Sequence, residues 1–234
     1  MNGKERIKDG VTWKSTVVFG DIHGLTFWEK IVDDNPECRY IFLGDYLDPY
    51  ENIPVRQLIE NLRKIIQLKK DRTNDVILLL GNHDLHYIQL KFKPYCRYDY
   101  TIEGDAHALF LENLHWFTYA YQEGNRIFTH AGISERWFFN DFNGDANKNI
   151  ADQLNNPSPA QLPALHRCGA IRGGARFTVG GIFWADIDEL HNPLPGYSQF
   201  VGHNRVENLQ THTCNGGEIT FCDCLFHEKY LILG

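Results

Sequence analysis

Three short apolar runs in the first third of the chain each end at a glycine that is followed by a polar cluster. The runs cover Thr16–Phe19, Tyr40–Leu43 and Val76–Leu80, and they are rich in β-branched or aromatic residues. Continuous rather than alternating apolar character is typical of strands that are buried on both faces. Such strands form parallel sheets covered by helices, so this feature indicates an α/β protein.

Two helices are predicted between these runs. Apolar residues recur at helical spacing over Val55–Ile66, with Asn52 as the expected N-cap and Pro54 in the first turn. A shorter helix over Phe27–Asp33, with Thr26 as its N-cap, joins the first two runs. The first third of the chain is therefore predicted to be a βαβαβ unit with right-handed crossovers.

The rest of the chain predicts a helix over residues 105–114 and more strands. Strands over 117–121 and 126–129, joined by a turn at 123–125, are expected to continue the sheet. Strands over 182–184, 199–201, 218–226 and 229–233 are expected to form a second, antiparallel-rich sheet. Residues 140–181 show little periodicity and contain three prolines, so loops and short helices are expected there. With no repeat or linker, we predict one domain over residues 1–234.

Composition excludes several classes of protein. The longest aliphatic run, Val76–Leu80, is far shorter than the roughly 20 residues of a membrane span, and the first ten residues offer no apolar segment to a signal peptidase. Thirty acidic against 23 basic residues give a net charge of −7, which argues against nucleic acid as a partner. Six scattered cysteines indicate reduced thiols, and we expect a cytoplasmic protein without membrane contact.

The polar clusters after the strands carry the chemistry. They are Gly20-Asp21-Ile22-His23-Gly24, Gly44-Asp45-Tyr46-Leu47-Asp48 and Gly81-Asn82-His83-Asp84, with Thr129-His130-Ala131-Gly132 and Gly202-His203-Asn204-Arg205 later in the chain. Open α/β sheets place their sites at the carboxyl ends of strands, so these side chains are expected to converge. Carboxylate and neutral imidazole together suit divalent manganese, iron or zinc. A carboxylate such as Asp45 can bridge two cations, and such a pair can clamp both oxygens of a phosphoryl displacement.

These five motifs resemble those of the calcineurin-like metallophosphoesterase superfamily, which carries DxH, GDxxD and GNH[DE] blocks and then two separated histidines, the last in a GH motif. All five occur in order over residues 20–205. The resemblance implies a four-layer α/β/β/α sandwich with two mixed sheets. It also implies two divalent metal ions (manganese, iron, zinc or nickel) and hydrolysis of a phosphorylated substrate by a hydroxide that bridges them.

The resemblance also assigns roles to residues. It places Asp21, His23 and bridging Asp45 on one metal. It places Asp45, Asn82, His130 and His203 on the other. His83 falls at the position of the general acid, which protonates the leaving alcohol, and Asp48 at that of the carboxylate that orients it.

Two further residues narrow the branch of the superfamily. Arg205 stands where the phosphodiesterase branch has a second histidine, so the chain looks more like the phosphoprotein-phosphatase-type branch, which includes symmetrical diadenosine tetraphosphate hydrolases. The Trp184 block, Phe183-Trp184-Ala185-Asp186, is similar to a Leu-Trp block of that branch. One departure is that Pro49-Tyr50 replaces the Arg-Gly that usually follows GDxxD. The missing arginine normally grips substrate phosphate, so Arg205, Arg172 or Arg176 substitutes for it, or the substrate is held differently.

Three functions remain open at this point. The first is a phosphomonoesterase that acts on a phosphoprotein or a small phosphorylated metabolite; the second is a dinucleotide polyphosphate hydrolase; the third is a non-catalytic binding scaffold. A single histidine at a strand end is commonly a satisfied polar residue, and Asp21 and Asp45 could cap the helices after them. Neither alternative explains the five motifs jointly. Cys222 and Cys224, with Cys214, suggest zinc, but two buried core thiols are the expected outcome.

Overall fold

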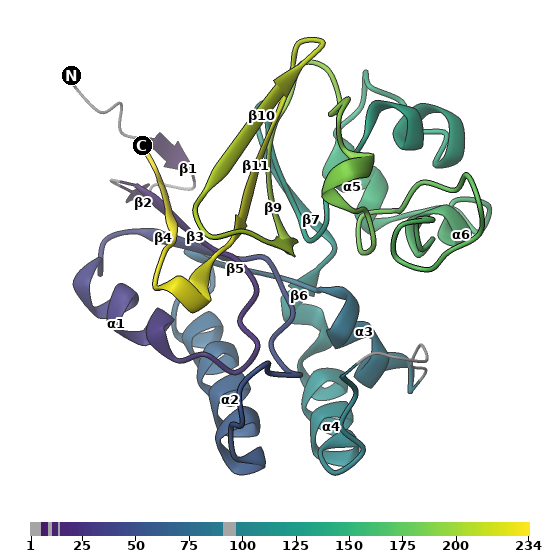
Figure 1. Cartoon of the computed structure of the whole chain (residues 1–234). Helices are drawn as coiled ribbons and strands as arrows, with labels where there is room; N and C mark the ends of the chain where they lie inside the picture. Colours follow the sequence, from purple (N-terminus) through teal and green to yellow (C-terminus); the bar gives the residue numbers. More distant parts are fainter. Residues whose placement is uncertain (1–5, 9–10, 14, 91–96) are drawn as a thin grey trace.

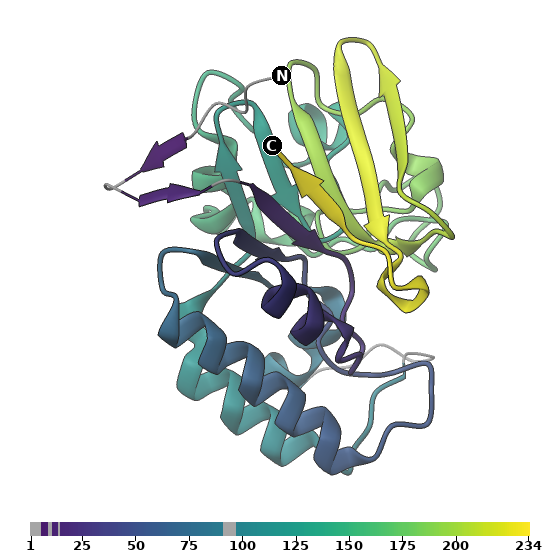
Figure 2. The same ribbon diagram turned by 90° about the vertical axis from the view of Figure 1, so that its left-hand side faces the viewer.

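A computed structural model describes residues 6–8, 11–13, 15–90 and 97–234 of the chain. Within these residues, two five-stranded sheets pack face to face with helices outside each of them (Figure 1, Figure 2). This confirms the predicted α/β/β/α fold with two mixed sheets. A separate hairpin pairs β1 (Arg6–Lys8) with β2 (Val11–Trp13) in antiparallel register.

The first sheet is built around the three apolar runs. Its order is β12 (Leu231–Leu233), β3 (Thr16–Phe19), β4 (Arg39–Phe42), β5 (Val76–Leu79) and β6 (Phe117–Thr118). β3 to β6 run parallel, and β12 pairs antiparallel with β3. The outer face is covered by α1 (Phe27–Asp34), α2 (Val55–Asp71) and α4 (Glu103–Asn113) (Figure 2).

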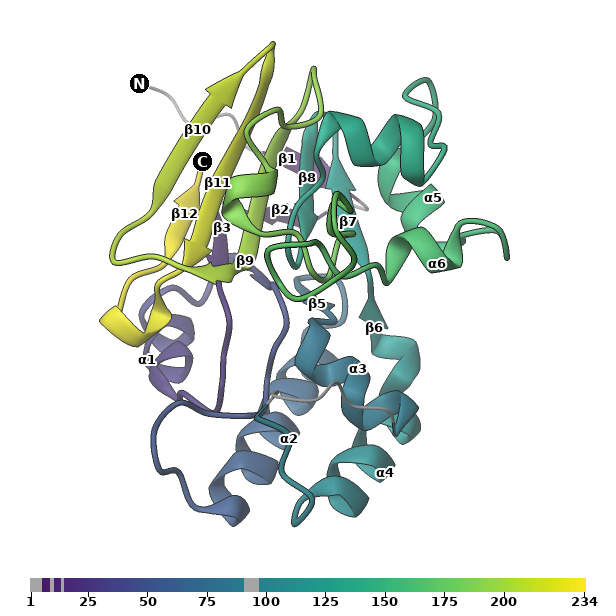
Figure 3. The same cartoon turned by 45° about the vertical axis from the view of Figure 1, so that its right-hand side comes forward.

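The second sheet lies between the first sheet and the C-terminal helices. Its order is β10 (Gln210–Cys214), β11 (Gly217–Asp223), β9 (Ser198–Arg205), β8 (Arg126–Thr129) and β7 (Ala120–Glu123). β9 pairs parallel with both of its neighbours, so the prediction of an antiparallel-rich sheet is wrong: two of the four pairings are parallel. The short helices α5 (Ile150–Asn155) and α6 (Leu162–Leu165) lie beside this sheet, in the stretch where loops and short helices are expected (Figure 3).

Strand periodicity separates the two sides of the first sheet. On β3, Val17 and Phe19 pack toward the helices, while Val18 points into the cluster between the sheets. Phe128 and Phe200 of the second sheet stack in that cluster, with ring centroids 5.0 Å apart. Because both faces of β3, β4 and β5 are covered by apolar groups, polar side chains are left to gather where these strands end.

Short helical segments connect the remaining elements. They are α3 (Asn82–Gln89), the π-helical segment η2 (Trp137–Asp141), and the 3-10 turns η1 (Leu114–Trp116), η3 (Ile187–Glu189) and η4 (Leu225–His227). α3 begins directly after β5, and η4 directly after β11, so both are fixed at the strand ends.

Three strand predictions need correction. Residues 117–121 do not form one strand: β6 belongs to the first sheet and β7 to the second, and the chain passes between the sheets at Tyr119. Residues 182–184 form a turn, because the N–H groups of Trp184 and Ala185 both donate to the Gly181 carbonyl, at 2.9 and 3.0 Å. The last strand, β12, joins the first sheet rather than the second.

The helix starts also differ in detail from the prediction. Thr26 is the N-cap of α1 as expected, although its side chain makes no capping hydrogen bond. The N-cap of α2 is Pro54 rather than Asn52, because the extended ψ of 134° at Pro54 delays the first helical turn. The N–H of Leu58 then donates to the Pro54 carbonyl at 3.2 Å.

The described cysteines behave as core or surface thiols. Cys168, Cys214, Cys222 and Cys224 are free, Cys38 is buried, and Cys96 lies outside the described residues. Cys222 and Cys224 are fully buried in apolar clusters, as predicted. Among the helices of the described residues, none has the length and apolar character needed to cross a membrane.

Candidate metal centre

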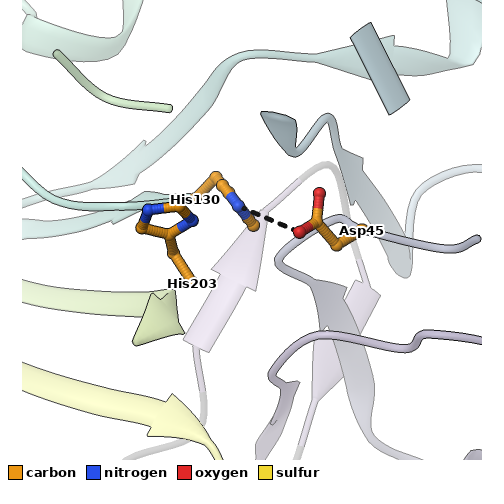
Figure 4. A group of neighbouring side chains, drawn as sticks. All are labelled: Asp45, His130 and His203. Atoms are coloured by element: carbon orange, nitrogen blue, oxygen red, sulfur yellow. Dashed lines mark ion pairs between the residues drawn. The ribbon is translucent and has the colours of Figure 1, made fainter. Parts of the chain in front are cut away.

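The polar clusters meet at one edge of the two sheets. β3, β4 and β5 are parallel neighbours, so Asp21, Asp45 and Asn82 emerge side by side at their carboxyl ends. His130 follows β8 and His203 lies on β9, so the second sheet delivers both histidines to the same place. Figure 4 shows the His130 ring directed at the Asp45 carboxylate, with the His203 ring beside it.

Each carboxylate is held by one oxygen and leaves the other toward the centre. The N–H of His203 donates to Asp21 Oδ1 at 2.8 Å, and the N–H of His83 donates to Asp45 Oδ1 at 2.9 Å. The two Oδ2 atoms lie 3.7 and 3.8 Å from His23 Nε2. Backbone N–H groups of the His203 and His83 motifs therefore orient the carboxylates of Asp21 and Asp45.

The histidine tautomers are fixed by carbonyl groups. His23 Nδ1 lies 2.7 Å from the Leu47 carbonyl and His130 Nδ1 lies 2.9 Å from the Leu43 carbonyl. A carbonyl can only accept, so in each neutral ring Nδ1 carries the proton and Nε2 presents a lone pair. This arrangement is typical of histidines that bind a metal through Nε2.

The lone pair of His130 points at other acceptors. His130 Nε2 lies 2.9 Å from Asn82 Oδ1 and 3.5 Å from Asp45 Oδ2 (Figure 4). His203 Nε2 is buried and has no hydrogen-bond partner among the described residues. Several acceptors that face one another without a donor repel, and a cation removes that repulsion. The donor set therefore fits divalent metal ions.

Two groups in the described part of the chain could hold a metal ion. One contains Asp21, His23 and Asp45; the other contains Asp45, His130 and His203. In each group, one ligand atom from every residue lies within 4.8 Å of the others. Asp45 is common to both, so the geometry suits two cations that share one carboxylate.

Backbone strain is concentrated in this region. In the described residues, nine non-glycine residues have a positive φ, and four of them are His23, Asp45, Asp48 and His203. L-residues adopt this conformation at a cost, and such strain is commonly stored at functional sites. Gly202 permits a close approach here, because a Cβ on it would lie 2.2 Å from Asp21 Oδ1.

Burial shifts the ionisation of the whole cluster. It raises the pKa of Asp21 and of Asp45, and neighbouring carboxylates raise both further. Burial lowers the pKa of His23 and of His203, and lowers that of His130 to about 3. All three rings are thus neutral, which is the form that binds metals.

His83 and Asp48 form a second arrangement beside the ligand cluster. His83 Nδ1 lies 2.6 Å from Asp48 Oδ2, and the Tyr87 hydroxyl donates to Asp48 Oδ1. Burial raises the pKa of Asp48 to about 6. Burial and then the charge of Arg97 lower the pKa of His83 to about 3. One proton is therefore held between two groups of shifted pKa at the edge of the cluster.

Comparison with known families identifies this arrangement. The profile of the calcineurin-like phosphoesterase family matches residues 14–215, which include every motif of the cluster. The chain belongs to the calcineurin-like phosphoesterase family. No curated protein sequence matches the chain.

Solved phosphatase structures share the family fold. A cold-active protein-tyrosine phosphatase of a psychrophile, Shewanella sp., is 14% identical with a TM-score of 0.55, over 93% of this chain and 74% of that one. A protein serine/threonine phosphatase from Saccharomyces cerevisiae is 16% identical with a TM-score of 0.54, over 89% of this chain and 67% of that one. At these identities the likeness concerns the fold.

The candidate metal centre opens into a cavity of about 650 Å³. The candidate metal ligands that line it are Asp21, His23, Asp45, Asn82 and His203. The other lining residues are Tyr50, His83, Arg97, Cys168, Arg172, Gly173, Gly174 and Trp184. The cavity is therefore lined by both acceptors and cationic groups, as binding of a metal-bound anion requires.

The three arginines predicted to hold substrate differ in position. Arg172 lines the cavity, where its Nε lies 2.7 Å from Asp186 Oδ2 and its Nη2 2.6 Å from Asn204 Oδ1. The guanidinium of Arg205 stacks on Tyr50 next to the cavity. The guanidinium of Arg176 lies over the exposed Phe177 ring, away from the residues that line the cavity.

Three residues of the candidate site are not predicted by the sequence motifs. Arg97 and Tyr87 carry no motif of their own, and only the fold brings them to Asp48. Asp223 is buried in hydrogen-bond contact with Asp21, and no described residue forms a hydrogen bond with its Oδ2. It was detectable: a carboxylate between two cysteines interrupts an otherwise apolar run at the end of a strand.

Proposed function

We propose that this protein is a metal-dependent phosphoesterase that hydrolyses phosphate monoesters of a phosphoprotein or a small phosphorylated metabolite. The observation that carries the proposal is the convergence of buried carboxylate oxygens and imidazole lone pairs around shared Asp45. Family membership supports hydrolysis of phosphate esters as the reaction class.

Two metal sites are proposed. Asp21, His23 and Asp45 would hold one divalent cation. Asp45, Asn82, His130 and His203 would hold the other. When bound, the two cations supply Lewis acidity to the phosphoryl oxygens and lower the pKa of a water for in-line attack. Manganese, iron, zinc and nickel all suit these ligands.

The chain's own groups complete the reaction. Asp48 fixes Nδ1 of His83, so Nε2 of that ring is left to deliver a proton to the leaving alcohol. A bound phosphate neutralises the charge of Arg97, one of the groups that lower the pKa of His83. Substrate binding thus favours the protonated ring when the proton is needed. Arg172 is positioned by Asp186 to contact substrate at the far wall.

A dinucleotide polyphosphate hydrolase is the second candidate. Trp184 lines the cavity, with its ring centroid 6.1 Å from that of His203. A tryptophan at this distance from the candidate ligands offers a stacking surface for a base. A binding scaffold is a third candidate. A scaffold without metal would gain nothing from buried acceptors that repel one another, because only a cation removes that repulsion.

The ligand proposal is tested with manganese-stimulated hydrolysis of p-nitrophenyl phosphate. Asp45→Asn and His203→Ala, purified, treated with chelator and remetallated, are expected to lose this hydrolysis. Asp71→Asn and His115→Ala change exposed residues of the same types and should keep it. Turnover that is unchanged in the two site variants would refute the assignment.

A substrate panel separates the candidates. p-Nitrophenyl phosphate, its bis ester, diadenosine tetraphosphate and a phosphopeptide are compared at equal manganese. Fastest turnover of a monoester supports the first candidate, and fastest turnover of the dinucleotide supports the second. Metal analysis that returns no bound ion, with no turnover on any of the four, favours the scaffold.

We also propose that the protein acts in the cytoplasm as a single domain over residues 1–234. The free thiols of Cys168, Cys214, Cys222 and Cys224 support a reducing compartment. Mass spectrometry after alkylation in fresh lysate counts reduced thiols, and a disulfide found there would contradict this location.

A further inference from the structure

The two departures of this sequence from the family motifs meet in space. Tyr50 stands beside Asp48 where the family motif ends in glycine, and Arg205 stands where a second histidine is found in one branch. The guanidinium carbon of Arg205 lies 4.1 Å from the centroid of the Tyr50 ring. On its other side Arg205 lies 3.7 Å from the centroid of Phe226.

A second arginine packs against the ring of Tyr50. The guanidinium carbon of Arg97 lies 3.4 Å from the Tyr50 centroid. Two guanidinium groups cannot share one ring face at these distances, so the ring lies between Arg97 and Arg205. The four groups form a column, which we call the Tyr50 column: Phe226, Arg205, Tyr50 and Arg97.

The column ends at the candidate metal ligands. Arg97 Nη2 lies 3.4 Å from His23 Nε2, the nitrogen that offers its lone pair in the first metal group. Its Nε donates to the Asp48 carbonyl at 3.0 Å, which fixes the plane of the guanidinium. Arg97 also lines the cavity. The guanidinium of Arg97 therefore lies between Asp48, which orients the proposed proton donor, and His23 of the first metal group.

Among the described residues no carboxylate forms an ion pair with Arg97, although Asp48 and Asp223 lie close enough to interact with its charge. Its contacts there are a ring, a carbonyl and an imidazole nitrogen. Arg172, in contrast, forms an ion pair with Asp186. A cation at His23 Nε2 and the guanidinium beside it would repel each other unless an anion lay between them. A phosphoryl group, bound by a guanidinium fork, is the anion that fits.

We propose that Arg97 is the residue that grips the phosphoryl group of the substrate, and that Tyr50 positions it. This inference rests on the proposed function for the identity of the anion. Arg97, from a distant part of the chain, then takes the role of the arginine that is absent after Asp48. Arg205 braces the opposite face of Tyr50 and does not itself enter the cavity.

The experiment measures binding of inorganic phosphate to the manganese-loaded protein by calorimetry, with hydrolysis of p-nitrophenyl phosphate recorded in parallel. Arg97→Ala is expected to weaken phosphate binding about 10- to 100-fold, the usual effect of losing hydrogen bonds to a charged group. Arg97→Lys keeps the charge but not the fork and should give a smaller loss. Tyr50→Ala should weaken binding about threefold to tenfold, whereas Tyr50→Phe keeps the ring and should bind as wild type.

Controls keep the outcomes distinct. Arg63→Lys changes an exposed arginine on α2 and should bind phosphate as wild type. The manganese content of the Arg97 variants should equal that of wild type. Unchanged phosphate affinity in Arg97→Ala, or no binding by wild type, overturns the inference. Binding that depends on Arg97, in a protein that hydrolyses no phosphate ester, overturns the proposed function and leaves the inference standing.

Discussion

Asp223 and Asp21 are two buried carboxyl groups in contact, and this contact has opposite consequences with and without a cation. Asp223 is 3% exposed, and burial raises its pKa to about 7. Its charge raises the pKa of Asp21 in turn. Without metal, the two carboxylates repel each other once both are ionised. With metal, the negative charge of Asp223 strengthens the attraction of Asp21 for the cation.

Replacement of Asp223 by asparagine is therefore expected to act in two directions. The manganese affinity of the variant should fall about 10- to 100-fold, as is typical when a group behind a metal ligand is changed. The chelator-treated variant should melt at a higher temperature than the wild type at pH about 8, because the repulsion is gone. Metal titration and thermal melting measure the two effects. Lower stability of the metal-free variant would contradict this account.

Tyr87 is predicted to position the proton donor rather than to touch substrate. Tyr87→Phe removes the hydroxyl that donates to Asp48, and that hydrogen bond lowers the pKa of the Asp48 carboxyl. We expect hydrolysis of phenyl phosphate, whose leaving group needs a proton, to fall about tenfold, and that of p-nitrophenyl phosphate to change less. The ratio of the two rates is the measurement. An equal fall for both substrates would indicate general structural damage instead.

At the scale of elements, strand β9 must approach the end of β3 closely for the site to form. Gly202 makes this possible, because a Cβ there would overlap Asp21 Oδ1. Gly202→Ala is expected to displace the Asp21 carboxylate, lower manganese affinity at least about tenfold and cost about 1–3 kcal/mol of unfolding free energy. Metal titration and denaturant unfolding test both expectations.

Gly104→Ala is the matched control for this substitution. Gly104 lies in helix α4, and a Cβ on it would meet no atom within 4 Å. Alanine there should raise stability by about 0.5–1 kcal/mol and leave metal binding unchanged. If Gly202→Ala behaved like this control, the close approach of β9 would not matter to the site.

The same scale shows what the sequence can predict. β3, β4 and β5 are predictable because continuous apolar runs buried on both faces leave few other structures, and the polar clusters after them follow from that. β10 was not predicted, because its residues, Gln210–Cys214, are mostly polar and exposed at the sheet edge. The chain passes from the first sheet at β6 to the second sheet at β7, and Tyr119 lies at this point. No local sequence pattern encodes this change of sheet. Arg97 likewise reaches the site only through the fold, by its contacts with Asp48 and Tyr50.

For the whole molecule, the site concentrates buried acids that oppose folding in the absence of metal. Burial raises the pKa of Asp84 to about 7 and that of Asp223 to about 7, both from an ordinary value of 3.8. Between these values the folded protein binds more protons than the unfolded chain. A raised folded-state pKa of an acid means that stability is lost as the pH rises from about 4 to about 7.

Metal-free protein should therefore melt at a lower temperature at about pH 7.5 than at about pH 5.5, and manganese should narrow this difference. At a manganese concentration about 100 times the dissociation constant, binding adds about 2.7 kcal/mol, which is roughly 5–10 °C for a chain of this size. The gain should be smaller at the lower pH, because protons compete with the metal for the carboxylates. Differential scanning calorimetry with chelator or manganese at each pH measures all four melting temperatures. Asp45→Asn removes the shared carboxylate, so the melting temperature of this variant should depend less on pH and less on manganese. In the wild type, a larger manganese effect at the lower pH would mean that the ions bind somewhere other than this acidic cluster.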